Sequence, residues 1–94
     1  MEMYNPPHPG EVLKKIYMDG ININVTILSK VLGVRRATIS AIVNEKSGIS
    51  SIMAIKLSHA FNTTPELWLG MQMEYDLWQT KQFYNGNDIQ VLYG

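Results

Sequence analysis

The sequence predicts an all-α protein, a five-helix bundle followed by a short C-terminal tail. Two observations support this prediction. Proline, glycine and asparagine residues divide the 94 residues into short segments, and the apolar residues within each segment recur at helical spacing without the alternation of a strand. A chain of this length closes one core, so we expect a single domain over residues 1–84 and a tail over residues 85–94.

The composition narrows the classes of protein. Hydrophobic residues make up 46% of the chain and charged residues 17%, which is typical of a packed globule. There is no cysteine, and His8 and His59 are the only histidines, so we expect no disulfide, no metal site and no cofactor. No apolar run approaches the ~20 residues that cross a membrane, so we expect a cytoplasmic protein that does not contact membranes.

The first helix is expected after residues 5–9, because each proline there lacks an N–H and disfavours helical geometry in the residue before it. Asp19-Gly20 is expected to end this helix. Its packing residues, at i, i+1, i+4 and i+5, are Val12, Leu13, Ile16 and Tyr17.

The second and third helices are short. The second is expected to begin at the N-cap Asn24 and end at Gly33, and the third to run from about Arg36 to Asn44. The apolar face of the second is Val25, Leu28, Val31 and Leu32, and that of the third is Ile39, Ile42 and Val43.

The fourth helix is expected from its cap Ser50 to about Phe61, with Asn62 ending it in a left-handed conformation. Its candidate packing residues are Met53, Ile55, Leu57 and Ala60. Thr64-Pro65-Glu66 starts a fifth helix that should reach about Tyr84. The segment after it is a turn and a weakly alternating tail, which could form a small strand, a partner-binding extension or a frayed end.

The second and third helices together form a helix-turn-helix pattern. Gly33 permits a tight turn, the small Ser29 four residues earlier allows the helices to cross closely, and Val34 points inward. Because Ile39 and Ile42 anchor the third helix, its polar face is free. This pattern predicts a DNA-binding protein.

Charge is unevenly distributed although the formal net charge is zero. Residues 30–61 hold five basic residues and one acidic residue, a net charge of +4, whereas residues 62–94 hold one basic and four acidic residues, a net charge of −3. The basic residues are Lys30, Arg35, Arg36, Lys46 and Lys56. Such asymmetry indicates one face for an anionic partner and an acidic end for another function.

The candidate DNA contacts follow from their places on the motif. Arg35 and Arg36, at the start of the third helix, can reach guanine O6 and N7. Thr38 and Ser40 can bond bases or phosphates, and Ala37 and Ala41 let the helix approach thymine methyl groups. The candidate phosphate contacts are Asn24, Thr26, Asn44 and Lys46.

The fifth helix is apolar on more than one face. One stripe is Leu67, Met71, Tyr75 and Trp78, and a second is Leu69, Met73, Leu77 and Tyr84. A small monomer offers one core, so the second stripe predicts a homodimer that binds a palindromic DNA site. The candidate dimer residues are Leu69, Met73, Leu77, Trp78 and Tyr84, with completion of the monomer core left open for Trp68 and Trp78.

From Asn5 to about Lys81 an ordered series of motifs resembles the HigA-type antitoxins of the XRE-like helix-turn-helix class, whose fold is lambda-repressor-like. The motifs are Pro7-His8-Pro9-Gly10-Glu11-Val12-Leu13, Leu32-Gly33-Val34-Arg35-Arg36 with Thr38-Ile39-Ser40, Gly48-Ile49-Ser50, Met53-Ala54, Lys56-Leu57, Thr64-Pro65-Glu66-Leu67-Trp68-Leu69, and Tyr75-Asp76-Leu77-Trp78. The resemblance implies a protein that neutralises a HigB-type toxin, an mRNA-cleaving RNase, and represses its own operon by binding double-stranded DNA.

The sequence departs from the family at two places. Arg35 stands where the family often has a Ser that caps the recognition helix, so its side chain is available for DNA. Ser51-Ile52 stands where the family often has Pro-Glu, and an exposed Ile52 would be unusual on a lone monomer.

Two alternatives to the antitoxin remain open: a stand-alone regulator without a toxin, and a protein-interaction module that does not read DNA. An enzyme is not expected, because His59, Asp76 and the serines lack a nucleophile elbow and no Gly-rich phosphate loop is present. We expect His59 to be a structural or surface residue and His8 a turn residue. A toxin should bind away from the recognition helix, for example on the first helix or the tail.

Overall fold

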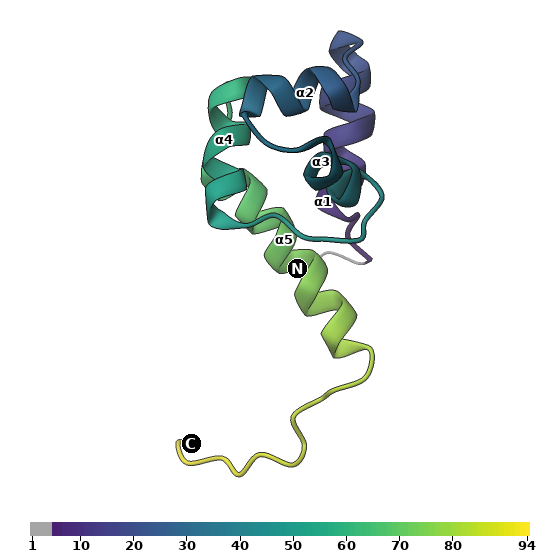
Figure 1. Ribbon diagram of the computed structural model, residues 1–94. Coiled ribbons are helices and arrows are strands. Elements are labelled where there is room, and N and C mark those ends of the chain that lie inside the picture. The colour runs from purple at the N-terminus through teal and green to yellow at the C-terminus, as the bar shows by residue number, and fades with distance from the viewer. Residues whose placement is uncertain (1–4) are drawn as a thin grey trace.

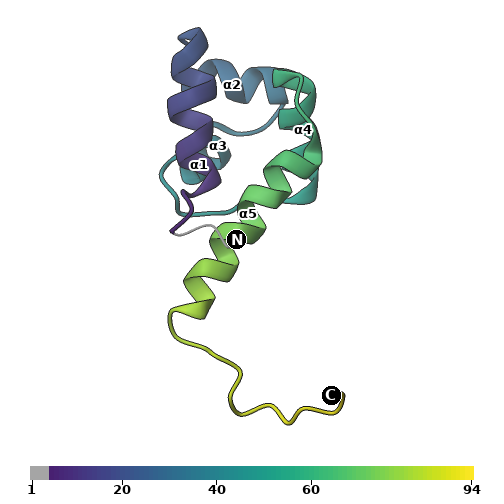
Figure 2. The ribbon, with the colours of Figure 1, turned by 180° about the vertical axis from the view of Figure 1, so that it is seen from behind.

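The computed structural model describes residues 5–94, and within them it confirms an all-α fold without strands. The helical elements are α1 (Pro9–Val12), η1 (Leu13–Met18), η2 (Asp19–Ile21), α2 (Val25–Leu32), α3 (Arg36–Val43), α4 (Ser51–Phe61) and α5 (Pro65–Lys81). The first four α-helices form a body in which α4 and α1 pack against α5, and the C-terminal part of α5 projects from this body and carries the tail away from it (Figures 1 and 2).

The start of the first helix differs from the prediction. Pro9 is its first residue, where the missing N–H costs nothing, so the expectation that residues 5–9 exclude helix is wrong at Pro9. His8 is the N-cap and not merely a turn residue: its Nδ1 accepts a hydrogen bond from the Gly10 amide at 2.9 Å. Its ring is buried and packs edge-on against Tyr75 of α5, with 4.8 Å between ring centroids.

The end of the first helical segment also differs. α1 continues as the six-residue π-helix η1 and the short 3₁₀-helix η2, and the left-handed residue that ends it is Asn22, not Asp19-Gly20. A π-helix forms i→i+5 bonds, which shifts the register of the side chains. As a result Ile16, expected in the core, is exposed, while Leu13 and Met18 are buried.

The predicted caps of α2 and α4 are confirmed. Asn24 Oδ1 accepts from the Ile27 amide at 2.9 Å, and Ser50 Oγ accepts from the Met53 amide at 3.2 Å. Gly33 and Asn62 end these helices in left-handed conformations, with φ of 68° and 54°.

The fifth helix is shorter than predicted, because it ends at Lys81 and not at about Tyr84. The Tyr84 hydroxyl donates to Asp88 Oδ1 at 2.9 Å, and this hydrogen bond, aided by slight desolvation, raises the pKa of Tyr84. Ile89, Val91, Leu92 and Tyr93 are all exposed, and no residue of 85–94 forms a strand. The division into a domain over 1–84 and a tail stays a prediction, since residues 1–4 lie outside the described part.

The core forms around Trp68, which is fully buried on α5. Its Nε1 donates to Thr63 Oγ1 at 2.8 Å, so the ring is buried without an unpaired polar atom. Tyr17 and Phe61 tilt against it at centroid distances of 5.1 and 6.4 Å. The other buried apolar residues are Leu13, Met18, Leu28, Leu32, Ile39, Ile42, Ile49, Met53, Ala54 and Leu57.

Several residues expected in the core are exposed instead: Ile16, Val31, Ile55, Ala60 and Leu67. On α4 the face that packs inward is formed by Met53, Ala54, Leu57 and Ser58, so Ile55 and Ala60 point elsewhere. On α5 the buried position is Trp68, and its neighbour Leu67 is exposed. The helices are short, and each buries a narrow stripe.

Gly10 lies where α1 crosses α3 so closely that a Cβ would overlap the main-chain carbonyl oxygen of Ile42. Because this neighbour is backbone, we expect Gly10→Ala to destabilise the fold by about 1–3 kcal/mol, as overpacking does. Thermal unfolding followed by circular dichroism measures the effect. Gly20→Ala is the matched control, since its Cβ would meet nothing within 4 Å, and an equal loss in both variants would contradict the close approach.

Candidate nucleic-acid interface

The turn between α2 and α3 is held by short-range contacts. The Gly33 amide donates to the Lys30 carbonyl at 3.3 Å, and the Val34 amide donates to the Ser29 carbonyl at 3.0 Å. Ser29 is buried, and its hydroxyl donates to the Thr26 carbonyl at 2.8 Å. A small, internally satisfied side chain at this position lets α2 and α3 pack closely, as the sequence predicts.

Lys56 of α4 stabilises the C-terminus of α2 from outside the motif. Its Nζ donates to the Leu32 carbonyl at 2.9 Å, where a cation is favoured by the helix dipole. Lys56 belongs to the basic segment 30–61, and this contact directs its ammonium group to the end of α2. The sequence predicts the charge of Lys56, and only the structure assigns its partner.

The third helix has one buried face and one free face. Ile39 and Ile42 are buried in the core and fasten α3 to the body. Of the candidate base contacts, Arg36, Ala37 and Thr38 are exposed, while Ser40 and Ala41 are half-buried. Beyond Arg36 the side chains on the free face are short, which allows a groove of DNA to approach the helix backbone.

Arg35 and Arg36 stand at the N-terminus of α3 with their side chains in solvent. Arg35 is the N-cap residue and, as predicted, makes no side-chain capping bond. Among residues 5–94 neither guanidinium takes part in an ion pair or a hydrogen bond. The first amides of α3 thus lie beside two unpaired cations, an arrangement suited to a phosphate or a base edge.

The other candidate contacts flank this face. Asn24 is exposed and caps α2 through its side-chain oxygen. Asn44, which follows α3, donates from Nδ2 to Ser40 Oγ at 3.2 Å, so these two candidates are already bonded to each other. Lys46 is exposed on the following loop, and Thr26 is half-buried in the first turn of α2.

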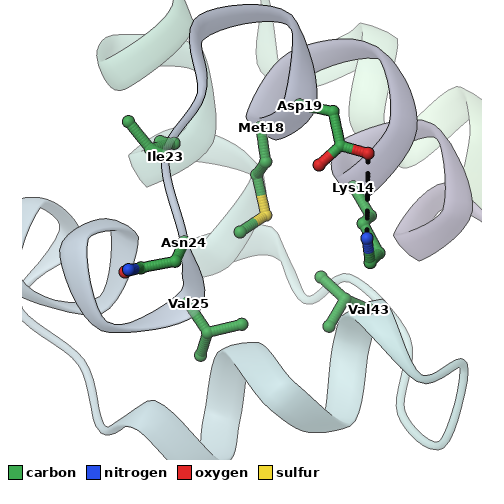
Figure 3. A pocket seen from close by; sticks show the side chains of 7 residues that line it. All are labelled: Lys14, Met18, Asp19, Ile23, Asn24, Val25 and Val43. Carbon is green, nitrogen blue, oxygen red and sulfur yellow. Dashed lines mark ion pairs between the residues drawn. The ribbon is translucent and has the colours of Figure 1, made fainter.

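A hollow lies beside the helix-turn-helix, between η1, the start of α2 and the end of α3 (Figure 3). Its volume is about 200 Å³, and its apolar lining includes Met18, Ile23 and Val43. Lys14 and Asp19 form an ion pair of 3.7 Å on one side of it. No group of metal-binding side chains occurs there or elsewhere in the part of the chain that the structure describes.

The second stripe of α5 is partly exposed. Met73 and Leu77 are exposed, whereas Leu69 packs against the core and Trp78 is half-buried. Tyr84 is also exposed, but it lies beyond the end of α5 at Lys81 and so does not continue the stripe along the helix. Residue Leu69 is therefore engaged within the monomer to an extent that the periodicity does not predict. No helix within residues 5–94 is long and apolar enough to span a membrane.

Two positioning residues went unnoticed in the sequence. Gln72 of α5 accepts a hydrogen bond from the Ile49 amide at 2.7 Å and fills the space beside Gly48, where a Cβ would collide with it. It thereby ties the loop after α3 to α5. Gly10 fixes α1 against α3, as described above. Neither role follows a sequence pattern, because both depend on tertiary contacts.

An anchored helix with a free basic end, joined by a glycine turn to a capped helix, defines a helix-turn-helix protein. Residues 22–68 match the family described as Helix-turn-helix, and the chain belongs to this family. It resembles HigA-type antitoxins within it, as the sequence motifs predict.

Three relatives illustrate the similarity. The chain is 54% identical to "Virulence-associated protein A'" of Dichelobacter nodosus, over 82% of this chain and 67% of the relative. It is 37% identical to "Antitoxin HigA-1" of Vibrio cholerae, over 84% of this chain and 74% of the relative. The solved structure of "antitoxin GraA in complex with its operator" matches with a TM-score of 0.89 and 33% identity, covering all of this chain and 97% of that one.

Proposed function

We propose that this chain is a sequence-specific DNA-binding antitoxin that represses its own operon and neutralises a partner RNase toxin. The observation that carries the DNA-binding part is the free face of α3 with Arg35 and Arg36 unpaired at its start. The similarity to an antitoxin solved with its operator and to a protein named HigA-1 supports both parts. Binding, not catalysis, is the proposed activity, and the proposed location is the cytoplasm.

Each candidate residue has a proposed role. Arg35 and Arg36 read guanines, with Thr38 and Ser40 as short polar contacts and Ala37 and Ala41 facing thymine methyl groups. Asn24, Thr26, Asn44 and Lys46 hold the phosphate backbone on either side of α3. In this arrangement the backbone contacts set the register, and α3 supplies the sequence preference.

The proposed assembly is a homodimer formed through the exposed part of α5 and through Tyr84, which follows the end of that helix. Met73, Leu77 and Tyr84 present apolar surface that the monomer does not cover, and Trp78 is only half-covered. Leu69 would contribute the part of its side chain left outside the core. A two-fold dimer would place two copies of α3 about 34–36 Å apart, one turn of a palindromic operator.

Toxin binding is proposed to use a surface other than α3. Co-expression with a tagged product of the adjacent reading frame tests this, using the variant Arg35→Ala, Arg36→Ala. We expect the toxin to co-purify with the variant as it does with wild type, because α3 keeps its buried anchors. Loss of the toxin from the folded variant would contradict separate surfaces, and capture of no partner by wild type would favour the stand-alone regulator.

A further inference from the structure

An apolar patch on α2 and α4 lies outside every role described so far. Its exposed members are Val31 of α2 and Ile52 and Ile55 of α4, with exposed fractions of 63%, 69% and 49%. Val31 and Ile55 face each other across a groove of about 390 Å³, which Leu32, Lys56, His59 and Ala60 also line. Ile52 extends the patch by one turn of α4.

Contiguous exposed apolar surface is a feature of protein interaction sites. The surroundings of this patch are basic: Lys56 lines the groove, Lys30 lies on α2, and no acidic residue occurs on α2 or α4. An occupant should therefore be apolar and carry negative charge.

The tail of the chain has this chemistry. Ile89, Val91 and Tyr93 alternate along it, so in an extended conformation their side chains share one face, and all three are exposed. Residues 82–94 contain Asp88 and no basic residue. Five extended residues, 89–93, span about 16 Å, which is also the length of the eleven-residue α4.

The tail leaves α5 at the end remote from α2 and α4 and runs away from the body in both views (Figures 1 and 2). The groove of the same copy is therefore not its immediate neighbour. We propose that the tail of one copy, residues 89–93, seats in the α2–α4 groove of a second copy. Reciprocal exchange between two copies would close the assembly, so that no groove stays open.

A paramagnetic label on the tail tests this contact in the full-length chain. Because the sequence has no cysteine, Gly94→Cys provides a single site for a nitroxide. The labelled protein is mixed with an ¹⁵N-labelled, nitroxide-free protein, so that signal loss reports only contacts between copies. We expect the amide signals of Val31 and Ile55 to be lost in the mixture and that of Ile16 to persist.

Matched variants distinguish binding of the tail in the groove from nonspecific association between copies. Ile55→Glu in the ¹⁵N-labelled copy, or Val91→Asp in the spin-labelled copy, should restore the signals, and Ile16→Glu, also at an exposed isoleucine, should leave them lost. Val91→Asp lies outside the helical body, so its effect does not depend on folding. Signal loss confined to the partner's tail or to α5, or no loss at all, would overturn the proposal.

Discussion

Replacing both Arg35 and Arg36 with Ala is expected to abolish specific operator binding while the helical circular-dichroism signal stays near that of wild type. A bidentate arginine contact contributes about 1–3 kcal/mol of base discrimination, so losing two should weaken binding by on the order of a hundredfold or more. Both side chains are exposed and make no hydrogen bond or ion pair within residues 5–94, so the fold should tolerate their removal.

A control variant must show that the loss of positive charge alone does not explain the weaker binding of the Arg35→Ala, Arg36→Ala variant. Lys81→Ala removes one cation from the end of α5, away from the helix-turn-helix, and should leave the affinity within about twofold. Fluorescence anisotropy with labelled operator DNA, repeated across a salt titration, measures both variants. An affinity of the double variant equal to that of wild type at every salt concentration would show that α3 does not read DNA through this pair.

Leu77→Glu is expected to give folded monomers that bind the palindromic operator at least about a hundredfold more weakly. The substitution places a charge in the exposed stripe of α5 without disturbing the core, because the Leu77 side chain is half in solvent. A monomer holds one half-site only, and the avidity of two linked half-sites is lost.

Sedimentation of the same samples gives the oligomeric state. Ile21→Glu is the control, because it also places a charge at an exposed apolar residue but lies far from α5 in the sequence. This variant should remain dimeric and bind as wild type does. If wild type sediments as a monomer at tens of micromolar and still binds a palindrome tightly, the α5 dimer is wrong.

Local chemistry explains which parts of the fold were predictable. Asn24, Ser50 and Thr64 accept hydrogen bonds from amides three residues later, and such caps depend on the adjacent chain alone. Gly33 and Asn62 likewise end helices through their own backbone preference. Predictions of this kind succeed because neighbouring residues suffice to form the contact.

Tertiary contacts explain the errors. Ile16 is exposed because η1 is a π-helix, and the spacing of the apolar residues in the sequence does not indicate this change of helical register. Trp68 is the buried centre of α5 because Thr63 pairs with its indole and Tyr17 and Phe61 cover its ring. Periodicity alone favoured Leu67, one residue earlier.

In the candidate interface, too, the features set by the local sequence were predictable and those set by tertiary contacts were not. The exposure of Arg35, Arg36, Ala37 and Thr38 agrees with the predicted free face of α3. The bond between Asn44 and Ser40, and the use of Lys56 at the end of α2, involve partners that spacing does not specify. The residues that read DNA stay a prediction until binding is measured.

Recognition of a specific DNA sequence can be measured directly on the wild-type protein. Purified wild-type protein is titrated against the DNA upstream of its own gene and against a shuffled sequence of the same composition, at low and at physiological salt. We predict binding to the upstream DNA on the order of a thousandfold tighter than to the shuffled DNA, weakening as salt rises. Equal affinity for the two sequences at both salt concentrations would contradict the account.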